Sequence, residues 1–268
     1  ADSLSAQIER VFMGKREVVR KLIVALLSQG HVLLEDVPGT GKTIAARALA
    51  SSLALVFRRI QCTSDLLPAD VLGVSVWAPA EEKFVYRKGP IVSNLVLVDE
   101  INRATPRTQS ALLEAMAEAQ VSIDGRLLAL PKPFFVIATE NPVEFEGTFP
   151  LPEAQKDRFL LSIRIGYPDE AAEALILESQ RRASHPVSDL KPLCSTEDIL
   201  AFQELVYQVY LDDSLRSWLL ALVRATRSHP SIQLGVSPRG SLALYRAAQA
   251  LAAIDGRNYV RPEDIKAL

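Results

Sequence analysis

Apolar and polar residues along the first two-thirds of the chain follow a pattern that predicts buried strands separated by helices. Short, continuous apolar runs are typical of strands that are covered on both faces. Such runs are present at His31–Glu35, Val56–Gln61, Leu95–Asp99, Phe134–Thr139 and Leu160–Ile165. Helical segments lie before or between them, at Ile8–Leu27 with a break near Gly14, at Thr43–Ser52 and at Pro106–Ala119. This alternation predicts an α/β fold with a mostly parallel five-stranded sheet and helices on both faces.

The pattern changes after Gly166-Tyr167-Pro168, where helical periodicity replaces the alternation. Helices are predicted at Glu170–Arg182, Ser195–Val209, Ser214–Arg227 and Pro238–Ile254, with a loop around Ser184–Pro192. The run from Ser195 to Asp198 has the composition of a helix N-terminal cap. We therefore expect two domains, an α/β domain over residues 1–167 and an all-helical domain over residues 168–268. The last residues open a helix and then stop, so we expect the natural chain to continue past Leu268.

Two inserts interrupt the alternation, and both have the pattern of a β-hairpin. Val74–Trp77 and Lys83–Tyr86 flank a polar turn that contains a proline, and Val121–Leu128 carries the tight-turn pair Asp124-Gly125. A hairpin added to such a core commonly serves a purpose outside it, such as contacting a partner or lining a pore. The alternative is an inert surface excursion.

The segment Asp36-Val37-Pro38-Gly39-Thr40-Gly41-Lys42-Thr43 joins a predicted strand to a predicted helix. A glycine-containing loop in this place is a phosphate cradle, because its backbone N–H groups turn toward one anion and the helix N-terminus adds partial positive charge. Lys42 can reach the β- and γ-phosphates, and the Thr43 hydroxyl can bind Mg²⁺. The candidate nucleotide contacts are Pro38, Gly39, Thr40, Gly41, Lys42 and Thr43. Asp36 departs from the common pattern, which has a glycine there.

Two carboxylates, Asp99 and Glu100, end another predicted strand. The carboxyl end of a parallel strand is where ligands bind in an open α/β sheet. We predict that Asp99 holds Mg²⁺ and that Glu100 polarises the attacking water. An acidic strand end without a partner is common in isolation, but the phosphate loop upstream argues against that alternative.

Composition narrows the class of protein. The chain has 49% hydrophobic and 23% charged residues and a net charge of −2, so it has no overall basic surface for nucleic acid or an anionic membrane, although a local one stays open. Cys62 and Cys194 are far apart, and His31, His185 and His229 are scattered, so neither set predicts a metal site. No membrane-spanning run or signal-peptide pattern is present. We expect a cytoplasmic protein without a nucleic-acid partner or membrane span.

The motifs together resemble those of the AAA+ ATPases and, within them, of the MoxR family. They follow one another through nearly the whole chain, at Leu33–Thr43, Ser64–Asp70, Lys88–Ile91, Val98–Ala104, Gln109–Met116, Ala138–Pro142, Leu151–Phe159 and Ser237–Arg239. Glu-Asp-Val-Pro-Gly at the phosphate loop is a form familiar in this family. The resemblance implies an αβα sandwich with a phosphate loop, followed by an all-helical lid, that binds ATP with Mg²⁺.

The resemblance also implies roles for three further residues. Asn141, which follows the strand Phe134–Thr139, would be the sensor 1 residue that orients the water beside the γ-phosphate; an Asn-Pro turn residue is the alternative. Arg158 would be an arginine finger offered to the nucleotide of a neighbouring subunit, as opposed to a surface arginine paired with Asp157 or solvent. Arg239 would be the sensor 2 arginine, closing the lid over the phosphates.

The adenine pocket is implied near the segment Val11-Phe12-Met13-Gly14, where related ATPases place a loop against the base. Met13 and Gly14 are therefore candidate nucleotide contacts. Apolar side chains suit a flat aromatic ring, but an ordinary core contact would have the same sequence.

The function implied by the resemblance is ATP hydrolysis by a ring, of six subunits, that remodels or matures partner proteins, some of which carry von Willebrand factor A domains. Three alternatives stay open. One is another AAA+ machine, such as the motor subunit of a metal chelatase or a helicase, and the near-neutral charge argues against a helicase. The others are a nucleotide-binding switch or scaffold with little turnover, and a small-molecule kinase that uses the same phosphate loop.

Overall fold

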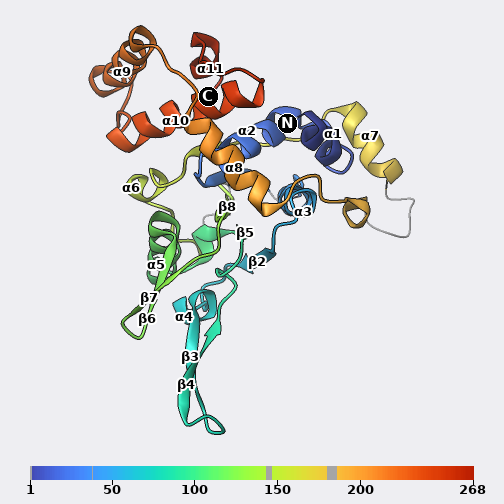
Figure 1. The fold of residues 1–268 in the computed structure, drawn as a ribbon, viewed down its shortest axis with the longest axis vertical. Helices are drawn as coiled ribbons and strands as arrows, with labels where there is room; N and C mark the ends of the chain where they lie inside the picture. The colour runs from blue at the N-terminus through green and yellow to red at the C-terminus, as the bar shows by residue number, and fades with distance from the viewer. Residues whose placement is uncertain (1, 38, 143–146, 180–185) are drawn as a thin grey trace.

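The centre of the computed structural model, which describes the chain except residues 1, 38, 143–146 and 180–185, is one five-stranded sheet (Figure 1). The strands are β1 (Val32–Glu35), β2 (Phe57–Gln61), β5 (Leu95–Asp99), β8 (Phe135–Glu140) and β9 (Leu161–Ile163). Their order is β2-β5-β8-β1-β9, and every neighbouring pair is parallel. The carboxyl ends of all the strands therefore meet at one edge of the sheet.

Each face of the sheet has its own apolar core, because successive side chains of a strand point to opposite faces. On one face, Val32 and Leu34 pack with helices α1 (Asp2–Glu9), α2 (Arg16–Leu27) and α3 (Lys42–Ser52). On the other face, Leu33 packs with α5 (Pro106–Glu118). Coverage of both faces requires the continuous apolar runs seen in the sequence, and it confirms the predicted αβα sandwich.

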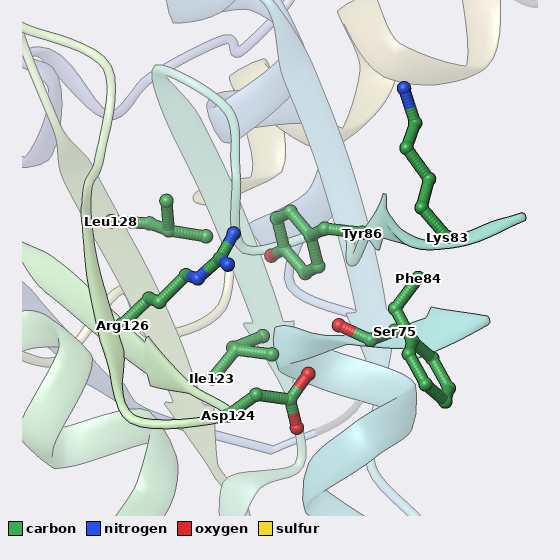
Figure 2. A pocket seen from close by; sticks show the side chains of 8 residues that line it. All are labelled: Ser75, Lys83, Phe84, Tyr86, Ile123, Asp124, Arg126 and Leu128. Atoms are coloured by element: carbon green, nitrogen blue, oxygen red, sulfur yellow. The ribbon is translucent and has the colours of Figure 1, made fainter. Parts of the chain in front are cut away.

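Both predicted hairpins are present, and they project toward the end of the molecule opposite α9, α10 and α11 (Figure 1). The first pairs β3 (Gly73–Ala78) with β4 (Lys83–Lys88) and follows the short helix α4 (Pro68–Leu72). The second pairs β6 (Gln120–Ile123) with β7 (Arg126–Ala129). A hollow of about 680 Å³ lies between the two hairpins, and Figure 2 shows the side chains that line it.

The elements described after β9 are helices joined by loops, as predicted. They are α7 (Glu170–Ser179), the 3₁₀ turn η2 (Pro186–Asp189), α8 (Thr196–Tyr207), α9 (Asp213–Ser228), α10 (Pro238–Ile254) and α11 (Pro262–Lys266). Helix α10 packs with α9 and α11 in one apolar cluster, and with Val24 of α2 and Val206 of α8 in another. The lid is thus attached to the sandwich through α2. The boundary near Tyr167 stays a prediction.

The differences from the predicted elements are local. Helix α1 begins at Asp2, earlier than the predicted Ile8, and the break predicted near Gly14 separates it from α2. The predicted loop around Ser184–Pro192 contains η2, although residues 184 and 185 lie outside the described residues. Three short elements were not predicted: α4, the 3₁₀ turn η1 (Ile101–Arg103) and α6 (Glu153–Lys156). Each is a single turn or little more, too short for apolar periodicity to reveal it.

Candidate active site

The phosphate loop connects β1 to α3 at the carboxyl edge of the sheet. Gly39 and Gly41 have φ angles of 85° and 87°, in the left-handed region that residues with a side chain rarely adopt. Gly41 is also the N-cap of α3 and provides no side-chain hydrogen bond, so the first N–H groups of the helix stay available to an anion. This geometry fits a phosphate. Pro38 lies outside the described residues.

Lys42 and Asp36 make hydrogen bonds that stabilise the conformation of the phosphate loop. The Lys42 ammonium donates to the backbone oxygen of Asp36 over 2.6 Å. Burial lowers the pKa of Lys42, whereas the carboxylates of Asp36, Asp99 and Glu100 act in the opposite direction. The Asp36 carboxylate accepts from the backbone N–H of Val37 and from that of Gly166. The aspartate that departs from the common loop pattern therefore ties the loop to the chain beyond β9.

Asp99 is oriented by two neighbouring strands. Its Oδ1 accepts from the Thr139 hydroxyl of β8 over 2.6 Å, and its Oδ2 accepts from Arg59 Nη2 of β2 over 2.6 Å. Thr139 Oγ1 also accepts from the Glu100 backbone N–H, at 2.8 Å. Each carboxylate oxygen has a second lone pair, so Asp99 can still bind a cation or its water shell.

Glu100 adopts a strained backbone conformation, with φ 56° and ψ 53°. Its carboxylate oxygen Oε2 accepts from Gln61 Nε2 over 2.8 Å and lies 3.2 Å from Arg103 Nε. These two contacts hold the carboxylate to one side. Gln61 was not predicted as a site residue. It ends β2 and pairs in register with Asp99, so strand register is the signal that could have identified it.

Asn141 directly follows β8, whose neighbours in the sheet are β5 and β1. The residue is buried, and its backbone oxygen accepts from Asn102 Nδ2 over 3.4 Å. The sheet order thus brings Asn141 to the same edge as the phosphate loop and Asp99. Its role as sensor 1 stays a prediction.

A hollow of about 110 Å³ lies beside the phosphate loop, where the adenine was predicted. Met13 lines it together with Val11, Phe12, Gly41 and Ile176 of α7. Gly14 does not line it in the described structure; instead, a Cβ at Gly14 would approach Ala172 of α7 to 2.7 Å. Gly14 therefore permits the close approach of α7, and its proposed contact with the base stays untested.

Arg158 and Arg239 lie together, away from the hollow beside Gly39 and Gly41. They line the same two hollows, one of about 240 Å³ and one of about 290 Å³. Arg158 is half-buried and donates from Nη1 to the backbone oxygen of Leu113 over 2.9 Å, and Arg239 is exposed at the start of α10. The predicted finger and the predicted sensor 2 arginine therefore share one surface.

Known proteins with similar sequences share this architecture. Residues 31–161 match the model of an ATPase family associated with various cellular activities (AAA), and residues 224–268 match an AAA lid domain. Chaperone MoxR1 of Mycobacterium tuberculosis is 42% identical over 97% of this chain and 70% of its own length. Protein MoxR of Paracoccus denitrificans is 31% identical over 98% of this chain and 84% of its own length. The chain belongs to the MoxR family of AAA+ ATPases.

Other relatives of this MoxR-family protein are similar over comparable lengths. The uncharacterized protein YeaC of Bacillus subtilis is 54% identical over 97% of this chain and 81% of its own length. A crystal structure of a candidate ATPase from Cytophaga hutchinsonii superposes with a TM-score of 0.91 at 38% identity, covering 99% of this chain and 83% of that one. Among the described residues, no helix is both long and apolar enough to cross a membrane.

Proposed function

We propose that this MoxR-family protein hydrolyses ATP with Mg²⁺ and uses the hydrolysis to remodel or mature partner proteins. The observation that carries the proposal is the convergence of Lys42, Asp99, Glu100 and Asn141 on one edge of the sheet, beside a loop with the geometry of a phosphate site. A cytoplasmic location, where ATP is supplied, fits this activity.

Each residue has a distinct part in the proposed reaction. Lys42 and the N-terminus of α3 neutralise the phosphates. Glu100 polarises a water for in-line attack on the γ-phosphate, and Asn141 orients that water. The contacts of Glu100 with Gln61 and Arg103 are both made by Oε2, so Oε1 can accept from the attacking water while these contacts persist.

The oxygen donors of Thr43 and Asp99 fit Mg²⁺, which prefers hard oxygen ligands and keeps several waters. Asp99 is already oriented by Thr139 and Arg59, and each of its oxygens retains a lone pair for a cation or its water shell. When bound there, Mg²⁺ would neutralise charge on the β- and γ-phosphates.

Assembly completes the proposed site. Arg158 and Arg239 lie together and away from the hollow at their own phosphate loop, which favours a role at the nucleotide of a neighbouring subunit. For Arg239 this differs from the sensor 2 role that the resemblance implied, in which it closes the lid over the phosphates of its own subunit. A second copy supplies that nucleotide, so we propose a homo-oligomeric ring, of six subunits as in the family resemblance. Arginine fingers contribute about 10³–10⁵ in turnover, because they neutralise charge on the transferring phosphoryl group.

The hairpins are the proposed contact with a partner protein. Val74, Trp77, Phe84 and Leu127 are exposed apolar side chains on them. In Figure 2, Arg126 and Leu128 of one hairpin point toward Tyr86 of the other across the hollow. An extended segment of a partner fits between two such faces. The proposed partners include proteins that carry a von Willebrand factor A domain, as the family resemblance implies.

A second candidate function is that of a chelatase motor subunit. The magnesium-chelatase 38 kDa subunit of Chlorobaculum parvum is 27% identical over 95% of this chain and 86% of its own length. The relatives named MoxR are more similar, so the remodelling function is preferred.

The test is the ATPase rate as a function of protein concentration, with sedimentation of the same samples and the Glu100→Gln variant as the blank. A specific rate that rises as larger assemblies form, and that Glu100→Gln lacks, supports a shared hydrolytic site. A constant rate from a monomer would instead favour a self-contained enzyme. No turnover above the Glu100→Gln blank in assembled protein would favour a switch or scaffold.

A further inference from the structure

Lys156 joins the two charged strand ends nearest the phosphate loop. It is the last residue of the short helix α6, and its Nζ lies 3.4 Å from Glu35 Oε1 and 3.2 Å from Glu140 Oε2. The side chains are largely buried, with exposed fractions of 28% for Lys156, 21% for Glu35 and 10% for Glu140. Ion pairs with this degree of burial are screened less than surface pairs and hold their partners more firmly.

The two carboxylates are one residue away from groups of the candidate nucleotide site. Glu35 ends β1 and precedes Asp36, which opens the phosphate loop. Glu140 ends β8 and precedes Asn141. The two glutamates are register partners, and the Asp36 backbone N–H donates to the Glu140 backbone oxygen over 3.1 Å. A displacement of the loop or of Asn141 is therefore transmitted directly to the carboxylates that hold Lys156.

The residues after Lys156 lead in the opposite direction, to the lid and the subunit surface. Asp157 Oδ1 accepts from the hydroxyl of Ser237, the N-cap of α10, over 2.7 Å. Arg158 comes next, with Arg239 of α10 lining the same hollows. Three consecutive residues therefore have three different contacts: Lys156 contacts the strand ends, Asp157 contacts the lid, and Arg158 is the predicted finger.

The charge of Lys156 holds two carboxylates of neighbouring strands together. Without the ammonium, the two glutamates would repel each other across neighbouring strands. Burial alone lowers the pKa of Lys156, but Glu140 and Glu35 outweigh it and the pKa is raised, so the side chain stays charged. Glu140 Oε2 is buried and lacks an aligned hydrogen bond among the described residues, so its contact with Lys156 is an ion pair, and the Lys156 charge is what compensates its burial.

We propose that Lys156 is a positioning residue that couples the nucleotide site of one subunit to the arginines that the same subunit presents to its neighbour. Its ion pairs with Glu35 and Glu140 fix α6, and with it Arg158, relative to the phosphate loop and Asn141. This inference rests on the proposed function, in which Arg158 acts at the neighbouring subunit's nucleotide.

The experiment compares Lys156→Met, Lys156→Arg and the control Arg216→Met, which removes a surface ion pair with Asp213 on α9. ATP binding is measured on dilute protein, and turnover and its Hill coefficient are measured on assembled protein. We expect Lys156→Met to bind ATP like the wild type but to turn over about tenfold more slowly, since ~1 Å misplacement of a catalytic group can cost up to 10²-fold. Its Hill coefficient should fall toward one. Lys156→Arg, which keeps the charge, should restore both, and Arg216→Met should match the wild type.

A mixing experiment distinguishes coupling from damage to the subunit's own site. Lys156→Met subunits are mixed with Glu100→Gln subunits, which have an intact Arg158 but cannot hydrolyse ATP. Restored turnover in the mixture locates the defect at the neighbour's site and supports the proposal. Weak ATP binding by Lys156→Met, failure to recover in the mixture or wild-type turnover and cooperativity would each overturn it. If the wild type itself lacks assembly-dependent turnover, the proposed function fails and not merely this inference.

Discussion

Individual side chains at the carboxyl edge of the sheet are positioned by short hydrogen bonds whose partners come from distant parts of the chain. Asp99 is held by Thr139 and Arg59, and Glu100 by Gln61. The partners lie on β2 and β8, the two strands that flank β5, so each candidate carboxylate is oriented by neighbouring strands.

Lys42→Ala should weaken ATP binding about 10- to 100-fold, because a hydrogen bond to a charged group contributes about 1.5–3 kcal/mol. The measurement is the Kd of a fluorescent ATP analogue. Lys266→Ala, which removes an exposed lysine on α11, is the matched control and should bind normally. Equal affinity in both variants would count against the phosphate cradle.

His31 predicts a pH dependence of stability. The buried ring accepts from the Val136 N–H at Nδ1, 3.1 Å, and Nε2 lies 3.0 Å from the Met116 oxygen. Burial, the largest cause, lowers its pKa from 6.5 to about 4. As the pH falls, His31 of the unfolded chain takes up a proton near pH 6.5, whereas His31 of the folded chain does so only near pH 4. The free energy of unfolding therefore keeps its full value above pH 6.5 and decreases as the pH falls from 6.5 toward 4.

Denaturant unfolding should give a free energy about 1 kcal/mol lower at pH 5.5 than at pH 7.5 from His31 alone. His31→Gln should lose this pH-dependent component, although its stability at pH 7.5 will also be lower because the side chain is buried. His229→Gln, at an exposed position, should keep the wild-type pH dependence. An unchanged pH dependence in His31→Gln would contradict the assignment.

At the scale of elements, the start of helix α8 is fixed by a local capping motif, and packing against α2 then holds the helix in place. Ser195 caps α8 by accepting from the Asp198 N–H over 3.2 Å, and Asp198 accepts in return from the Ser195 N–H over 2.8 Å. This capping box was predicted from four residues of sequence. Helix α8 then packs against α2, where Gln203 donates to the Leu26 oxygen over 2.7 Å.

Ser195→Ala should destabilise α8 by about 1 kcal/mol, the usual cost of losing an N-cap. Hydrogen exchange of the first-turn amides of α8 provides the measurement, and these amides should exchange faster. Ser217→Ala, an exposed serine within α9, removes a hydroxyl without removing a cap and should leave α8 unchanged. Equal exchange in both variants would show that packing alone fixes the start of the helix.

At the scale of the whole molecule, the candidate site residues fall into two groups that lie apart. The phosphate loop and Glu100 lie at the carboxyl edge of the sheet, whereas Arg158 and Arg239, which is on the lid helix α10, lie together at another surface. In the proposed ring, each site takes its arginines from the neighbouring subunit. Activity then belongs to the assembly.

Arg158→Ala should bind ATP normally and lose most turnover, because its finger is missing while its own loop is intact. Mixing it with Glu100→Gln, itself inactive, should recover part of the activity, since Glu100→Gln subunits supply the missing arginine. The measurement is ATPase rate against mixing ratio. Activity that stays at the sum of the two inactive variants would argue that Arg158 acts within its own subunit.

The sequence by itself determined the features that depend on neighbouring residues. Apolar runs located all five sheet strands to within a residue or two, Gly39 and Gly41 located the left-handed backbone of the loop after β1, and Ser195 identified a helix start. These signals are local, because strand burial, left-handed backbone and capping are each decided within a few residues.

Only the tertiary structure decided which distant residues meet. The strand order sets β2 beside β5, which brings Gln61 to Glu100, and β8 beside β1, which aligns Glu35 with Glu140. It also gathered Arg158 and Arg239 on one surface and placed Lys156 between two carboxylates. These contacts depend on strand order and register, which are set by packing over the whole sheet, and no single segment of the sequence contains that information.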